Sequence, residues 1–133
     1  MKTAKQLRTA SIMLALTACA PATAPSGPIS LAGSEWGYAD GTDRFVQFGN
    51  AMRVSGSGGC NSFSGTYAQE GDKLQIGSLA VTRMACPEPI MSNESEFLAN
   101  LERTRTASIA ALTLTLMDAD GAVLTTLQRR DPD

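Results

Sequence analysis

The chain has 133 residues, of which 43% are hydrophobic and 18% charged, an ordinary composition for one small globular domain. Its formal net charge is −2, but Lys2, Lys5 and Arg8 lie at the extreme N-terminus, and the rest of the chain is more acidic. An acidic chain with no basic cluster is unsuited to nucleic acid, and the lack of histidine removes the usual general base and the commonest metal ligand. We therefore expect no nucleic-acid partner, no metal and no cofactor.

The first 18 residues have the features of an export signal. A positive segment precedes residues 10–16, ASIMLAL, an apolar run too short to span a bilayer. Residues 16–19, LTAC, resemble the bacterial lipobox, in which the signal is removed before a cysteine that then carries lipid. This predicts a lipoprotein signal peptide over residues 1–18 and lipidation of Cys19. The alternative is an ordinary signal peptide, which would leave Cys19 as an unexplained free thiol.

Residues 19–30 are expected to be the lipidated N-terminus and a tether. Prolines at positions 21, 25 and 28 lie among alanine, serine and threonine, which favours a semi-extended segment with little to bury. Two acyl chains hold a protein stably on a bilayer, so the membrane is a predicted partner through this lipid. By resemblance to lipoprotein sorting rules, Ala20 after the cysteine implies the outer membrane, with the domain facing the periplasm.

The folded domain is expected over residues 31–130. Residues 35–39 and 44–48 are typical of short strands, Gly49 and Asn50 indicate a turn, and Met52 with Val54 continue a hairpin. Trp36 could line a ligand pocket. A small domain with few aromatic residues needs its largest side chain inside, which favours a place in the core.

Residues 56–67, GSGGCNSFSGTY, are the most distinctive stretch. The glycines predict a sharp turn that leads into a strand. Alternation along this strand puts Phe63, Gly65 and Tyr67 on one face, with Gly65 as the gap between two rings. Asn61 either presents its amide to a ligand or partner or satisfies the bent backbone of the turn.

Two cysteines, Cys60 and Cys86, remain if Cys19 is lipidated. Export places them in an oxidising compartment, which predicts a disulfide between them. Two alternatives stay open: a metal site, which two thiols without histidine can hardly complete, and two unpaired buried thiols.

The second half of the chain adds further strands and one helix. A polar turn at residues 70–73 precedes residues 74–81, which predict one strand kinked near Gly77 or two short strands. Residues 93–103 predict a helix, with Asn93 and Glu96 as a capping-box-like start and an apolar stripe formed by Phe97, Leu98 and Leu101. Residues 112–116 and 122–128 predict a closing hairpin around residues 118–121, DADG.

The segments that connect the expected strands are too short for repeated crossovers, so the strands should pair mostly antiparallel. This predicts the α+β class: a compact β-sheet, open or closed into a barrel, with one packed helix. The DADG segment could also suggest a calcium loop, but the remaining acidic ligands are missing, and D-x-D-G suits a hairpin turn. The glycine run lacks the lysine of a phosphate-binding loop, and no serine lies in G-x-S-x-G.

Four glutamates could supply an acid and a base for glycan hydrolysis, although a solvated helix face explains three of them. They are Glu88, Glu94, Glu96 and Glu102.

Two segments resemble the META domain family of HslJ-like proteins. The pattern GCN-x-F-x-G-x-Y corresponds to Gly59, Cys60, Asn61, Phe63, Gly65 and Tyr67. The pattern T-x-M-x-C-P corresponds to Thr82, Met84, Cys86 and Pro87. The likeness continues through the helix and the closing hairpin at Leu114, Leu116, Asp120 and Gly121, and so covers nearly all of the expected domain.

The family consists mostly of small bacterial envelope and stress-associated domains. The resemblance implies a non-enzymatic envelope lipoprotein, a heat-shock or stress-response protein that supports envelope integrity or stress tolerance by binding an envelope protein or a small molecule. The alternative is a small periplasmic inhibitor of an envelope-directed enzyme such as lysozyme, which would insert an exposed loop into the enzyme's cleft. An enzyme would instead need two or more acids gathered in one cleft.

Overall fold

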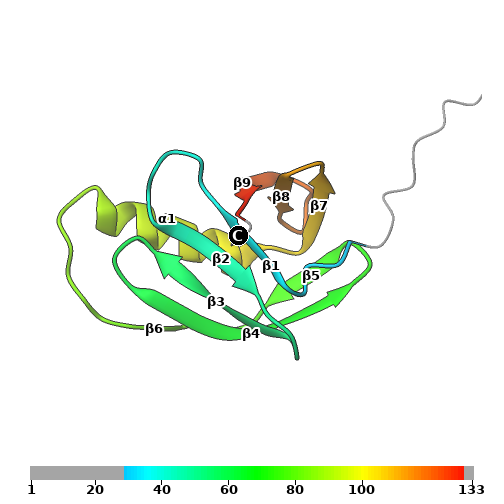
Figure 1. Ribbon diagram of the computed structural model, residues 1–133, viewed down its shortest axis with the longest axis horizontal. Coiled ribbons are helices and arrows are strands. Elements are labelled where there is room, and N and C mark those ends of the chain that lie inside the picture. Colours follow the sequence, from blue (N-terminus) through cyan, green and yellow to red (C-terminus); the bar gives the residue numbers. More distant parts are fainter. Residues whose placement is uncertain (1–28, 131–133) are drawn as a thin grey trace, which may run out of the picture.

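The computed structural model describes residues 29–130, which form nine strands and one helix (Figure 1). The strands in chain order are β1 Ser34–Gly37, β2 Arg44–Phe48, β3 Arg53–Gly58, β4 Ser62–Glu70, β5 Lys73–Ile76, β6 Ala80–Val81, β7 Thr106–Ala110, β8 Thr113–Met117 and β9 Val123–Arg129. The helix α1, Ile90–Arg103, lies between β6 and β7 in the sequence.

Eight of the strands pair into a closed ring. The order is β3, β2, β1, β9, β8, β7, β5 and β4, and β4 pairs with β3 to complete the circuit. All pairings are antiparallel, as the short connections predict. The ring is weakest between β5 and β7, where the paired register contains only Lys73 and Thr106. The molecule is therefore of the expected α+β class, with its sheet closed on itself.

Helix α1 packs against strands from different parts of the ring. It contacts β3 and β5 on one side and β8 and β9 on the other, and Figure 1 shows it running between these groups of strands. Phe97 and Leu101 are fully buried, and Leu98 packs against them from a half-buried position. The apolar stripe predicted for this helix is confirmed.

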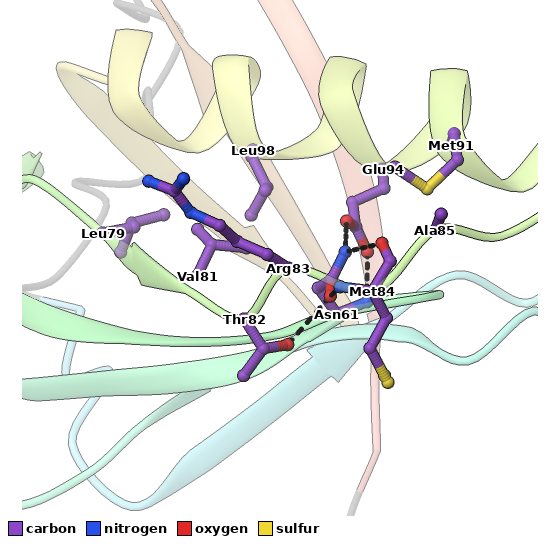
Figure 2. Close-up of a pocket in the computed structure, with 10 residues that line it drawn as sticks. All are labelled: Asn61, Leu79, Val81, Thr82, Arg83, Met84, Ala85, Met91, Glu94 and Leu98. Atoms are coloured by element: carbon purple, nitrogen blue, oxygen red, sulfur yellow. Dashed lines mark hydrogen bonds between the residues drawn. The ribbon is translucent and has the colours of Figure 1, made fainter.

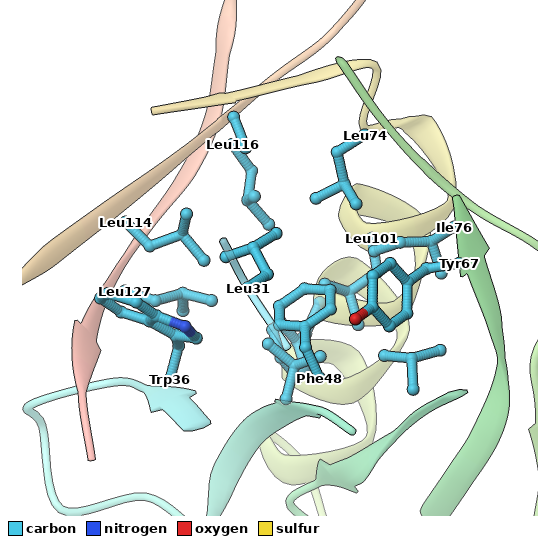
Figure 3. Close-up of a cluster of buried hydrophobic side chains, with 14 of the residues drawn as sticks. Leu31, Trp36, Phe48, Tyr67, Leu74, Ile76, Leu101, Leu114, Leu116 and Leu127 are labelled. Atoms are coloured by element: carbon cyan, nitrogen blue, oxygen red, sulfur yellow. The ribbon is translucent and has the colours of Figure 1, made fainter. Parts of the chain in front are cut away.

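The core fills the interior of the ring beneath the helix (Figure 3). Trp36 has no exposed surface, and its indole N–H donates to the Ser34 hydroxyl at 2.7 Å, so the tryptophan belongs to the core. Phe48 and Tyr67 pack edge to face with ring centroids 5.1 Å apart. The Tyr67 hydroxyl donates to the Gly49 carbonyl at 3.1 Å, which satisfies the one polar atom of that side chain.

Several local predictions were wrong. The helix begins at Ile90, three residues before Asn93, and Pro89 occupies its N-cap position without a side-chain cap, so there is no capping box. The Ser92 N–H, in the first turn, donates to the Glu88 carboxylate instead. Strand β7 was missed because its sequence, TASIA, is short and contains one large apolar residue, Ile109, so its alternation of polar and apolar residues is weak.

The glycine run is also more strand than turn. Strand β3 continues through Gly58, and only residues 59–61 turn the chain into β4. A Cβ atom on Gly56 would lie 2.7 Å from the Phe63 ring, so this glycine is required by close packing between strands. Along β4 the predicted faces are confirmed, with Phe63 and Tyr67 buried and Ser62, Ser64 and Thr66 exposed.

The predicted signal peptide, Cys19 and residues 19–28 of the tether lie outside the described residues. Within residues 29–130, no helix has the length and apolar character needed to cross a bilayer.

Candidate functional site

The turn at residues 59–61 is fixed to the segment that follows β6. Cys60 and Cys86 form the predicted disulfide, with their Cα atoms 6.0 Å apart. The two residues are separated by 26 positions, so the bond encloses β4, β5 and β6 in one covalent loop. The alternatives of a two-thiol metal site and of free thiols do not describe this structure.

Asn61 is buried at the centre of this turn and is hydrogen-bonded through every polar atom of its side chain. Its amide oxygen accepts from the Met84 N–H at 2.6 Å and from the Thr82 hydroxyl at 2.9 Å. Its amide nitrogen donates to the Met84 carbonyl at 3.1 Å and to Glu94 Oε1 at 2.7 Å. An asparagine side chain can donate two and accept two hydrogen bonds, so none remains for a ligand. The geometry gives Asn61 a structural role, the second of its two predicted roles.

Glu94 completes this network from helix α1. Its side chain is buried, and its Oε2 accepts from the backbone N–H groups of Cys60 at 2.9 Å and Asn61 at 2.5 Å. Burial raises the pKa of Glu94, but the hydrogen bonds from Asn61 and Cys60 together outweigh it and leave the pKa below its ordinary value. The carboxylate is therefore ionised at neutral pH, and its charge is balanced by N–H donors.

Sequence reasoning missed this role and assigned Glu94 to a solvated helix face. The available signal was its spacing, because Glu94, Phe97 and Leu101 lie at i, i+3 and i+7 and so share one side of the helix. The structure adds a contact that the sequence does not show, between Glu94 and Gly58. A Cβ atom at this position would lie 2.7 Å from Glu94 Oε2, so the carboxylate needs a residue without a side chain beside it.

A groove opens beside this network, between β6 and helix α1 (Figure 2). It has a volume of about 550 Å³. Its apolar wall comes from Leu79 and Val81 on the strand side and from Met91 and Leu98 on the helix, while Asn61 and Glu94 form its polar part. The segment with Thr82, Arg83, Met84 and Ala85 supplies the remaining lining.

The motif residues fall into two groups. The first group lies at the turn or lines the groove and consists of Gly59, Cys60, Asn61, Thr82, Met84 and Cys86. Phe63 and Tyr67 are core residues, and the space above Gly65 is taken by the Ser78 carbonyl and by Leu79. Pro87 is exposed beside the disulfide. Met84 exposes 58% of its surface, although its backbone is held by Asn61.

The remaining acids are not gathered with Glu94 in the groove. Glu88, Glu96 and Glu102 are exposed, and none of them lines it. In the DADG segment, Asp118 Oδ1 accepts from the N–H groups of Asp120 and Ala122, which is the predicted turn. Among residues 29–130, no group of three acidic, cysteine or histidine side chains could hold a metal ion.

Comparison with known proteins gives the family. No curated protein matches the chain. An NMR structure of a protein from Burkholderia xenovorans is similar, with 24% identity, a TM-score of 0.62, and coverage of 77% of this chain and 85% of that one. A second similar NMR structure has 26% identity, a TM-score of 0.57, and coverage of 74% of this chain and 90% of that one. The family model of the META domain matches residues 30–131, and the chain therefore belongs to the META domain family.

Proposed function

We propose that the protein is a lipid-anchored domain of the bacterial envelope that acts by binding. The observation that carries this proposal is the sequence LTAC at residues 16–19, which follows a short apolar run and ends in the cysteine that a lipoprotein would acylate. Ala20 after that cysteine favours the outer membrane, with the META domain facing the periplasm. In this position the domain would support envelope integrity or stress tolerance.

The disulfide between Cys60 and Cys86 also supports a location in the envelope. Disulfides persist in exported proteins and are rare where cellular thiols keep cysteines reduced. Cys60 and Cys86 are paired, so Cys19 is the one cysteine left for another chemistry.

A binding role agrees with the chemistry of the groove. Its buried polar groups, Asn61 and Glu94, are engaged in internal hydrogen bonds, and the pKa of Glu94 is held low. A general acid needs a carboxyl group that is protonated near the working pH and can reach its substrate, and Glu94 meets neither condition. The groove nevertheless offers an apolar wall that a ligand could cover.

Fractionation of cells expressing the full-length protein tests the anchor. The unchanged chain should sediment with membranes, and Cys19→Ser should appear in the soluble periplasmic fraction. Thr23→Ser, a matched change in the tether, should remain in the membrane fraction. A Cys19→Ser protein that stays with the membranes would refute the lipid anchor.

The proposed location in the outer membrane is tested separately. By the sorting resemblance, Ala20→Asp should move the protein from outer-membrane to inner-membrane fractions on a density gradient. A gradient position that does not change would contradict the outer-membrane assignment while leaving the lipid anchor in place.

Binding is tested with the Cys19→Ser chain immobilised and exposed to solubilised envelopes, followed by identification of the retained proteins. A partner retained by this chain and lost when the groove is altered by Leu98→Glu would support the binding role. Retention and inhibition of a purified lysozyme, unaffected by Leu98→Glu, would instead identify the protein as an enzyme inhibitor.

A further inference from the structure

Strand β6 lies outside the ring and forms an open edge. It pairs with β4 at Phe63 and Ser64, and within the described chain it pairs with no other strand. The edge of a sheet presents backbone N–H and C=O groups to which another strand can bind. Helix α1 lies across the groove from β6, and Leu79, Val81 and Thr82 line the groove on the strand side.

The hydrogen-bonding register shows which groups face outward. The Thr82 N–H donates to the Ser62 carbonyl at 3.1 Å, so Ser62 and Thr82 occupy a hydrogen-bonded position of the ladder. Such positions alternate along an antiparallel pair, and the next pair, Phe63 and Val81, is therefore non-hydrogen-bonded. The N–H and C=O groups of Val81 consequently point away from β4, toward the open side.

The surroundings of the edge suit an extended chain. The groove volume of about 550 Å³ lies within the range of roughly 300–1,000 Å³ found for ligand clefts. Its apolar wall would accept side chains from one face of an added strand. A second hollow of about 330 Å³ lies along β4 and β6, and its lining includes the exposed residues Ser62, Ser64 and Ala80.

The charge of the groove indicates what the added chain should carry. Arg83 lines the groove, is exposed, and has no hydrogen bond or ion pair with any of residues 29–130. The acid that lines the groove, Glu94, is buried and already accepts three hydrogen bonds. A ligand in this groove therefore meets a positive charge that is not paired within residues 29–130, and the complement of that charge is a carboxylate.

We propose that the groove binds an extended segment of a partner protein by strand addition to β6. Backbone groups of the segment bind the outward N–H and C=O of Val81, alternate apolar side chains cover Leu79 and Leu98, and an acidic side chain pairs with Arg83. This mode of recognition takes affinity from main-chain hydrogen bonds and specificity from alternate side chains. The inference rests on the proposed binding role and is independent of the lipid anchor.

A defined peptide tests this proposal on the full chain carrying Cys19→Ser. The probe is a blocked, fluorescein-labelled octapeptide of alternating valine and threonine with glutamate at both ends, so that either strand direction places an acid near Arg83. Fluorescence polarisation should show saturable binding, about tenfold tighter than for the same peptide ending in lysines. Arg83→Glu should reverse that order, whereas the matched exposed change Arg53→Glu should leave it unchanged.

Two further measurements locate the added strand. The peptide should slow hydrogen exchange at the Val81 amide, while the Thr82 amide, already bonded to β4, should change little. Val81→Pro removes the outward donor without touching the bond at Thr82, and it should abolish binding. If Val81→Pro fails to fold, the charge reversal at Arg83 and the exchange of the Val81 amide decide the question.

The proposal is overturned if the glutamate-ended peptide does not bind saturably, if Arg53→Glu and Arg83→Glu have equal effects, or if the Val81 amide keeps its exchange rate. It is also overturned if Arg83→Glu causes aggregation without changing peptide preference, because Arg83 would then only protect a short edge strand. Self-association through β6 that excludes the peptide would assign the edge to a second copy. None of these outcomes depends on whether Cys19 is lipidated.

Discussion

At the scale of single residues, the main result is that Asn61 and Glu94 join the glycine turn to the helix. Asn61 connects the turn to Thr82 and Met84, and Glu94 holds the backbone of Cys60 and Asn61. The composition of the turn predicts an asparagine that serves the backbone, but it does not identify the partners. Glutamate is rarely buried, and for this reason the sequence predicts Glu94 on the solvent-exposed face of the helix. The helical spacing of Glu94 with Phe97 and Leu101 indicates otherwise, and the close approach of Gly58 is visible only in the structure.

The charge of Glu94 predicts a pH dependence of stability. The folded-state pKa of Glu94 lies below its ordinary value of 4.5, so the ionised form stabilises the fold above that pH. This contribution is lost as the pH falls below 4.5 and through the folded-state pKa. We expect Glu94→Gln to lower the free energy of unfolding by about 1–3 kcal/mol at pH 7, because one of the two accepting oxygens becomes an NH2 donor and leaves at least one N–H group of the network without its acceptor.

The difference in free energy of unfolding between the unchanged chain and Glu94→Gln should then become smaller as the pH is lowered below about 4.5. Urea unfolding at each pH measures this difference. Glu96→Gln, at an exposed position of the same helix, is the control and should change little at any pH. A difference that stays constant from pH 7 to pH 3 would contradict an ionised Glu94 in the network.

At the scale of elements, alternation and turn residues predicted most of the sheet. Residues 44–48 match β2, and the turn at residues 118–121 joins β8 to β9 as expected. The missed elements are those with the weakest local pattern. Strand β7 contains small and polar residues and is defined by its pairing with β8. The start of α1 was misplaced because Asn93 offered a familiar cap, while the helix follows Pro89.

The helix stripe gives a prediction with an internal control. Leu101 is fully buried in the core inside the ring, so Leu101→Ala should reduce the free energy of unfolding by about 2–5 kcal/mol. Leu98 is half-buried at the groove, and Leu98→Ala removes the same atoms at a smaller cost. Thermal or urea denaturation of the two variants measures the comparison. If Leu98→Ala reduced the free energy of unfolding as much as Leu101→Ala, or more, the core would not lie on the Leu101 side of the helix.

The disulfide stabilises three strands together. Closing a loop of 26 residues restricts the unfolded chain, and the chain-entropy model gives about 3.5 kcal/mol before any cost in the folded state. Reduction, or the double variant Cys60→Ser with Cys86→Ser, should therefore lower the melting temperature clearly, as measured by circular dichroism. An unchanged melting temperature after reduction confirmed by thiol alkylation would show that the covalent loop contributes nothing.

At the scale of the whole molecule, the structure is a closed ring of strands with one helix, and we propose that a proline-rich segment tethers it to a membrane. The sequence predicted the fold class because the META motifs, the single amphipathic helix and the short connections agree with one another. Closure of the ring and the position of the groove could not be predicted. Both depend on contacts between distant segments, such as β1 with β9 and Asn61 with Glu94.

We propose that a lipid on Cys19 anchors a disulfide-closed domain in the envelope. Intact-mass spectrometry of the membrane-extracted, unreduced protein tests it most directly. The account predicts a chain that begins at Cys19, carries the mass of attached acyl groups on that residue, and yields joined peptides from Cys60 and Cys86 after digestion. A mature N-terminus without acyl groups, or two freely alkylated thiols at Cys60 and Cys86, would contradict it.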